Sequence, residues 1–254
     1  MKVDTHALRA VLVLSWACLA GVSVAACSSS GGSSASSGSS GTVTSSAADP
    51  LSGKSGSQVA SEAISDLKSA PSFTMKGTII QSGSTLGVNL AYKAGEGCQG
   101  TVTQVGKGSF YLVVIGSTAW LKPDDAFWRS YAGSNASQVI ALLGGRYLKG
   151  TTSNSNTAQF AQLCNSKSLV NSMTLPTNVS KGKVTMLNGR QVLPLTDTSK
   201  GSTMYVTDTS KPEIVQIIGT KPGSAGKVTF VVGAPVTLTA PPASETVNGS
   251  SFGF

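Results

Sequence analysis

The cysteine thiols are the groups of this chain whose chemistry is easiest to assign. Cys27 comes directly after Val24-Ala25-Ala26, at the end of an apolar run over residues 11–24, and Lys2 and Arg9 precede that run. A basic start, an apolar run and small residues before a cleavage point are the parts of a secretory signal. The run is shorter than the ~20 residues that a membrane-spanning helix needs. The thiol of Cys27 is therefore a candidate for modification after export.

The tetrapeptide that ends at Cys27 resembles a bacterial lipobox, in which diacylglycerol is attached to the thiol and the peptide is cut just before it. This predicts a signal peptide over residues 1–26 and a lipid anchor on Cys27 that holds the protein on the extracytoplasmic face of the cell membrane. Two alternatives stay open at this point: a plain secretory signal that is cut after Ala26, and an uncleaved segment.

Cys98 and Cys164 are the only other cysteines left once Cys18 is removed with the signal. In an oxidising compartment such a pair predicts a disulfide, which would restrict the unfolded chain by roughly 4 kcal/mol on the chain-entropy estimate. Two buried free thiols are the alternative. A metal site is disfavoured, because no histidine or further cysteine is available to complete it.

The remaining residue types give little support for a catalytic site. The only histidine, His6, lies in the signal, so the mature chain has no imidazole for a Ser-His-Asp or Cys-His arrangement. Asp124 and Asp125 could in principle serve a glycosidase, but an Asp beside a proline at a strand end more often caps the next helix. Residues 95–100 match G-x-G-x-x-G, yet a strand pattern follows them rather than the helix that a dinucleotide site requires. We expect a protein that is not an enzyme and that needs no cofactor or metal.

The composition of the chain limits the kinds of partner that it is expected to bind. The net charge is +8, but charged residues make up only 12% of the sequence and basic residues are scattered. Basic and aromatic residues do not alternate as they do in nucleic-acid modules, so no nucleic-acid partner is expected. Residues 27–56 are the lipidated cysteine and a Ser/Gly-rich stretch, which predicts a tether with a span of roughly 30 Å. The expected domain covers residues 57–247, and residues 248–254 are expected to be a flexible tail.

The apolar pattern predicts a helix followed by many strands. Residues 57–70 place Val59, Ala63, Ile64 and Leu67 on one stripe, with Ser57 as the expected cap. An insert over residues 123–150 and 157–173 loses the period of two, and its second part has helical spacing. Strands are expected at residues 73–79, 86–92, 99–105, 109–115, 118–122, 183–187, 190–196, 202–207, 213–218, 226–232 and 236–239.

This order predicts an α+β fold in which one curved antiparallel sheet of about eleven strands carries an N-terminal helix and a helical insert between its two halves. Asn188-Gly189 is the dipeptide typical of a tight hairpin turn.

Residues 57–247 also resemble the actinobacterial LppX/LprA/LprF/LprG lipoproteins, which share the LolA-like half-barrel with periplasmic lipoprotein carriers. The resemblance rests on four stretches: VASEAISDLKSAPSFTMKGTI, LNGRQVLPLTD, GSTMYVTDTSKPEIVQIIG and KVTFVVGAPVTLTAPPASETV. It implies a cavity for acyl chains between the concave face of the sheet and the helices, and hence a carrier of lipid or glycolipid. The cysteine pair at 98 and 164 departs from the family pattern. No short family motif marks lipid contacts, so the site residues come from periodicity alone.

Apolar side chains on the expected inner face and around the insert are the candidate lipid contacts. They are Met75, Ile79, Leu86, Val88, Leu90, Leu112, Val114, Trp120, Trp128 and Tyr131. We expect Trp120, Trp128 or Tyr131 near the mouth of the cavity, while ordinary core packing remains the alternative for each residue.

Two functions follow. The first is a tethered lipoprotein that binds or carries lipid, glycolipid or acylated molecules in the cell envelope, with an envelope transporter as a further partner. The second is an interaction module that binds a wall polymer or a protein through its exterior. A contiguous apolar cavity of several hundred Å³ would distinguish them.

Overall fold

The computed structural model describes residues 50–81, 83–173, 178–221 and 225–254. The predicted signal, the lipidation site Cys27 and most of the tether lie outside these residues. Within the described part of the chain, no helix combines the length and the apolar character needed to cross a membrane.

The first helix, α1 (Gly56–Ser69), forms where the apolar stripe predicts it. Its cap is Ser55 rather than the expected Ser57, because Ser55 and Gln58 form a reciprocal capping box: each side chain accepts from the backbone N–H of the other residue. The four stripe residues are buried, so the helix packs that face into the core.

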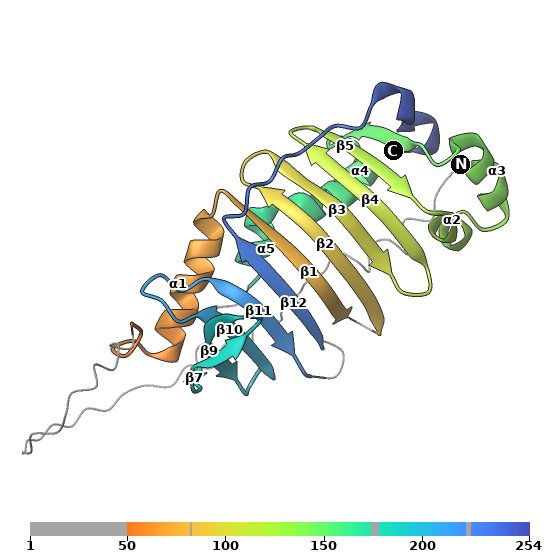
Figure 1. The fold of residues 1–254 in the computed structure, drawn as a ribbon. Coiled ribbons are helices and arrows are strands. Elements are labelled where there is room, and N and C mark those ends of the chain that lie inside the picture. The colour runs from red at the N-terminus through yellow and green to blue at the C-terminus, as the bar shows by residue number, and fades with distance from the viewer. Residues whose placement is uncertain (1–49, 82, 174–177, 222–224) are drawn as a thin grey trace, which may run out of the picture.

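Thirteen strands of the described chain form one mixed sheet in the order β13-β6-β5-β4-β3-β2-β1-β12-β11-β10-β9-β7, with β8 paired to β9. All neighbours are antiparallel except β13 and β6, and Figure 1 shows the sheet strongly curved. The strands are β1 (Ser72–Gln81), β2 (Ser84–Lys93), β3 (Gly97–Gln104), β4 (Gly108–Ile115), β5 (Thr118–Pro123), β6 (Tyr147–Thr151), β7 (Ser180–Lys181), β8 (Thr185–Leu187), β9 (Arg190–Asp197), β10 (Ser202–Thr207), β11 (Ile214–Gly219), β12 (Gly226–Val232) and β13 (Thr246–Asn248). The predicted α+β class and curved sheet are confirmed.

The strand expected at residues 236–239 is wrong. Pro235, Pro241 and Pro242 flank this segment and offer no N–H to a ladder. The side chain of Gln99 holds it instead: its Nε2 donates to the Thr237 carbonyl at 3.0 Å, and its Oε1 accepts from the Thr239 N–H at 3.1 Å. One glutamine therefore replaces the pairing that a neighbouring strand would supply. The short strands β6, β7 and β13, which the pattern does not predict, bring the sheet to thirteen.

The helices of the insert are α2 (Asp125–Tyr131), α3 (Ala136–Leu143), α4 (Ser155–Ala161) and α5 (Ser166–Asn171). Figure 1 shows α4 and α5 behind the sheet, and α2 and α3 at one end of it. The core lies between this side of the sheet and the helices, where facing pairs such as Met75 with Leu90 are buried. The sheet face that carries the predicted apolar hairpin is therefore the covered one.

Residues 248–254, expected as a flexible tail, pack against the fold. A short 3-10 helix, η5 (Gly249–Phe252), brings the ring of Phe254 to 5.9 Å from that of Phe160. Phe254 is 6% exposed and joins the core cluster. An aromatic C-terminal residue that buries most of its surface stabilises the docking of the whole segment.

Candidate functional site

A small apolar pocket lies between the inner face of the sheet and the insert helices. Its volume is about 40 Å³, and it is partly open to solvent. Three groups of elements line it: strands β2 to β4, helix α2, and α4 with the 3-10 turn η3 (Gln162–Cys164). The lining residues are Leu86, Val102, Gln104, Gly108, Phe110, Phe127, Tyr131, Gln159, Phe160 and Leu163.

The strands supply the floor of the pocket through their register. Leu86 faces Gln104 across β2 and β3, and Val102 faces Phe110 across β3 and β4. Side chains of directly paired residues lie on the same face of a sheet. Two adjacent pairs thus place aliphatic and aromatic groups side by side on the covered face.

Helix α2 forms one wall, and its first turn is held against the start of β4. Asp124 accepts from the Phe127 N–H at 2.7 Å and from the Ser109 N–H at 2.9 Å, so one carboxylate caps the helix and joins it to β4. Gly108 has a φ of +106°, and a Cβ at this position would lie 2.1 Å from the Phe127 nitrogen. Only a glycine lets the helix approach this strand so closely. The capping role expected for Asp124 is confirmed.

Aromatic rings fill most of the space next to this wall. The ring of Phe110 meets Phe127 edge to face at 5.7 Å and Phe160 at 5.3 Å. Phe127 also lies 4.4 Å from the ring of Tyr131. The Tyr131 hydroxyl donates to Gln104 Oε1 at 2.5 Å, and burial raises the pKa of Tyr131. Ring contacts and this side-chain hydrogen bond therefore add to the Asp124 cap in holding helix α2 at the pocket.

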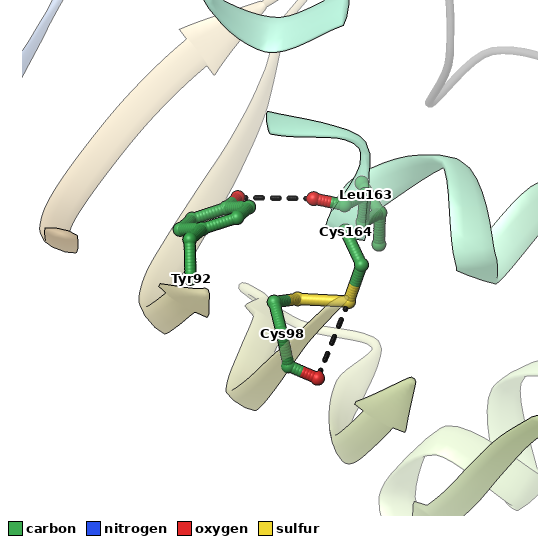
Figure 2. The surroundings of a disulfide bond; sticks show 4 residues. All are labelled: Tyr92, Cys98, Leu163 and Cys164. Atoms are coloured by element: carbon green, nitrogen blue, oxygen red, sulfur yellow. Dashed lines mark hydrogen bonds between the residues drawn. A yellow bond between two sulfur atoms is a disulfide. The ribbon is translucent and has the colours of Figure 1, made fainter. Parts of the chain in front are cut away.

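The opposite wall is held covalently. Cys98 on β3 and Cys164 in η3 form the predicted disulfide, with Cα atoms 5.0 Å apart, and Figure 2 shows it beside Leu163 and Tyr92. The Tyr92 hydroxyl donates to the carbonyl of Leu163 at 2.9 Å, and burial raises the pKa of Tyr92 well above its usual range. Leu163, which lines the pocket, is therefore fixed by its own carbonyl and by the next residue.

Polar groups in the pocket are few and uncharged. None of the ten lining residues carries a formal charge. The oxygen of Gln104 is already bonded to Tyr131. The Oε1 of Gln159 is buried and accepts no hydrogen bond from the described residues. The pocket surface is thus largely apolar and carries no formal charge.

Two of the ten sequence candidates line this pocket: Leu86 and Tyr131. Ile79, Val88 and Trp128 are half-buried and pack against the core. Four further candidates are buried in the core: Met75, Leu90, Leu112 and Val114. Trp120 is the one candidate left.

Of the three residues named as alternatives for the mouth, Tyr131 lines the pocket, whereas Trp120 does not. Its neighbours Ala119 and Leu121 belong to the core, so the alternation of β5 places Trp120 on the other face of the sheet. There it is paired with Val113 and Lys149, whose ammonium lies 6.0 Å from the centre of the indole ring.

Several lining residues were missed as site candidates. Phe110 and Phe127 stand out in the sequence as part of the aromatic group around the insert, and Phe160 and Leu163 have helical spacing there. Val102 follows the alternation of its strand. Nothing in the sequence marks Gln104, Gly108 or Gln159, because their role depends on which elements meet.

This pocket is smaller than the cavity that the resemblance implies. An acyl chain needs a space of several hundred Å³, and the pocket holds about 40 Å³. Buried side chains from α1, α5 and both halves of the sheet form one packed core cluster on the inner face. The protein therefore presents a surface pocket above a packed core.

Comparison with protein-family models finds no match, and comparison with curated proteins finds none either. Solved structures do match. LprF from Mycobacterium bovis is 13% identical with a TM-score of 0.48, over 73% of this chain and 96% of that one. The lipoprotein LppX from Mycobacterium tuberculosis is 10% identical with a TM-score of 0.45, over 72% and 98%. A LolA superfamily protein from Nitrosomonas europaea is 10% identical with a TM-score of 0.23, over 75% and 96%. LprF and LppX bear the names of two members of the lipoprotein group that the sequence resembles.

Proposed function

We propose that this protein binds the apolar chain of an amphiphile at the pocket between β2–β4, α2 and α4, and that it does so without catalysing a reaction. The observation that carries the proposal is the lining itself: aromatic and aliphatic side chains, none of them charged, around a space that opens to solvent. Burial of a chain contributes about 0.8 kcal/mol per methylene, which needs no catalytic group. Lipids, glycolipids and acylated molecules all offer such a chain.

The size of the pocket sets how a chain enters. About 40 Å³ accommodates the tip of a chain, and deeper insertion requires one wall to move. The wall at η3 is bonded to β3 through Cys98 and Cys164, whereas α2 is held by ring contacts, by the Asp124 cap and by the bond between Tyr131 and Gln104. We expect α2 to be the wall that yields, because no disulfide of the described residues ties it to the sheet.

The cellular setting belongs to the same proposal. A diacylglycerol anchor on Cys27 and the Ser/Gly-rich tether would hold the domain in the cell envelope near membrane lipids. A carrier in that position takes its ligand from one membrane surface or transporter and passes it to another. The thiol and the tether lie outside the described residues, so this part rests on the sequence.

Binding can be tested with the mature chain carrying Cys27→Ala, titrated with dodecanoate and with lysophospholipid in a calorimeter. Leu86→Trp fills the pocket from its floor, and we expect it to weaken binding about tenfold, which corresponds to the loss of one to two buried methylenes. Val231→Trp is the matched control, because Val231 is an exposed strand residue outside the pocket.

A wild-type chain that binds no amphiphile, and that carries no lipid when purified from its host envelope and examined by native mass spectrometry, would contradict the proposal. The solid core would then favour the alternative function, a module that binds a wall polymer or protein through its exterior.

A further inference from the structure

The outer face of the sheet, opposite the helices and the pocket, gathers lysines that the sequence scatters. Seven adjacent strands, β12 and β1 to β6, contain five lysines and no aspartate or glutamate. Each lysine comes next to a core residue of its own strand, so strand alternation places all five on the outer face. Figure 1 shows this face in front, with α4 and α5 behind it. The five are Lys76, Lys93, Lys122, Lys149 and Lys227.

Three of these lysines have no anionic partner in the described part of the chain. Lys93 pairs with Glu96 at 2.9 Å, and Lys122 pairs with Glu245 at 3.9 Å. The other three form no ion pair with a described residue. The outer face therefore keeps a surplus of positive charge, which attracts anions from solution.

Lys76 and Lys227, the lysine pair, are neighbours on this face. Lys76 faces Thr229 across β1 and β12, and Lys227 faces Thr78 across the same two strands. This register makes the two lysines diagonal neighbours, roughly 7–8 Å apart at the backbone. Both side chains are exposed. One carboxylate or phosphate group of a ligand can therefore contact both ammonium groups.

A row of polar and aromatic groups leads from the lysine pair across the sheet. Directly paired residues form it, one from each strand from β1 to β5: Lys76, Asn89, Thr101, Tyr111 and Lys122. Four strand spacings of about 4.8 Å put its ends roughly 19 Å apart. The three middle side chains, the polar row, form no hydrogen bond with a described residue. They are free to bind a ligand that lies across the strands.

The chemistry of this row fits a polysaccharide better than a bilayer. Hydroxyl and amide side chains exchange hydrogen bonds with sugar hydroxyls, and the half-buried ring of Tyr111 offers a flat surface to a sugar ring. Among the large apolar side chains that are exposed in the described chain, only Val231 lies on these seven strands. The face therefore has almost nothing to insert into a bilayer.

We propose that the outer face of β12 and β1 to β6 binds an anionic polysaccharide, with acidic groups of the polymer on the lysine pair and its sugar rings along the polar row. The proposal goes beyond the proposed function and does not depend on it. The pocket lies on the covered side of the sheet, so one molecule can bind an amphiphile and a polysaccharide together.

Three probes test the proposal with the mature chain carrying Cys27→Ala. Polygalacturonate is an acidic polysaccharide, dextran is a neutral one, and phosphatidylglycerol vesicles are anionic without a sugar polymer. Calorimetry measures binding of the polysaccharides, and sedimentation measures binding of the vesicles. We expect polygalacturonate to bind, and more weakly as salt is added. Dextran should bind about fivefold less tightly, because it lacks the charge for two exposed ion pairs.

Variants then locate the effect. Lys76→Gln with Lys227→Gln should weaken polygalacturonate binding about fivefold, the size of two exposed ion pairs. Lys183→Gln with Lys211→Gln makes the same change of charge at exposed positions outside these strands, and should leave binding unchanged. Tyr111→Leu keeps the charge and should weaken binding by removing the surface for a sugar ring.

An equal loss in the two lysine double variants would overturn the proposal, because net charge rather than this face would then govern binding. Dextran that binds as well as polygalacturonate would also overturn it. Vesicles that bind more tightly than polygalacturonate would identify the face as a membrane contact instead. None of these results bears on the pocket, which the dodecanoate titration tests separately.

Discussion

At the scale of single residues, Gly108 and Tyr92 each perform a task that few other side chains could. Gly108 has a positive φ and lies against the backbone of α2. Tyr92 is buried among apolar neighbours, and its hydroxyl satisfies the Leu163 carbonyl at the pocket wall. Both residues connect a strand to an element of the pocket, so a substitution at either should alter the pocket.

Gly108→Ala should destabilise the fold more than Gly106→Ala. Both glycines have positive φ, but a Cβ at Gly106 meets nothing within 4 Å, whereas at Gly108 it meets the Phe127 nitrogen at 2.1 Å. The Gly106 variant therefore bears only backbone strain, about 1 kcal/mol, and the Gly108 variant should lose at least ~2 kcal/mol. Urea unfolding measures both. Equal losses would show that α2 does not depend on this close approach.

Tyr92→Phe should lower the free energy of unfolding by about 1–2 kcal/mol near neutral pH, because the Leu163 carbonyl loses its buried donor. Alkaline pH should shrink this difference. The unfolded chain releases the phenol proton near the ordinary pKa of 10.0, while the folded chain retains it to higher pH. The wild type therefore loses stability as pH rises above 10, and the variant lacks this contribution. Urea unfolding from pH 7 to 11 compares the two; a constant difference would contradict the assignment.

At the scale of elements, the two walls of the pocket are held in different ways. The η3 wall is tied to β3 by the disulfide. The α2 wall depends on its cap and on ring packing. This asymmetry is the physical basis for expecting motion at α2.

Replacing both bridged cysteines, Cys98→Ala with Cys164→Ala, should lower the free energy of unfolding by roughly 4 kcal/mol, because the unfolded chain regains the entropy of a long loop. The η3 wall should also loosen, which faster hydrogen exchange of the amides around residues 162–164 would reveal. Reduction of the wild type is the control and should give the same two changes. A double variant as stable as the wild type would show that packing alone holds η3 in place.

At the scale of the whole molecule, the expected anchor and the folded domain are separate parts joined by the tether. Cys27→Ala should release the protein from the membrane fraction into the medium, or leave it as an unprocessed precursor, because no thiol remains to accept diacylglycerol. Cell fractionation followed by intact-mass measurement distinguishes these outcomes. Ser28→Ala, one residue later, should leave anchoring unchanged. An acylated product from the Cys27 variant would refute the lipobox.

The local sequence determined much of this molecule, because some patterns need no partner to be interpretable. Alternation of apolar residues placed ten of the thirteen strands, and Asn188 and Gly189 adopt the positive φ values of the expected hairpin turn. The cysteine pair followed from elimination, since only two thiols remained for an oxidising compartment.

Tertiary structure alone decided the rest, because the remaining questions concern which surfaces meet. Periodicity separates the two faces of β5, but only the packed sheet shows that Trp120 lies away from the core. Gln99 replaces a strand partner for residues 237–239 across a long stretch of sequence. The volume of the pocket arises where α2, α4 and three strands converge. A cavity is the space that side chains leave unfilled, and no single segment of sequence determines that space.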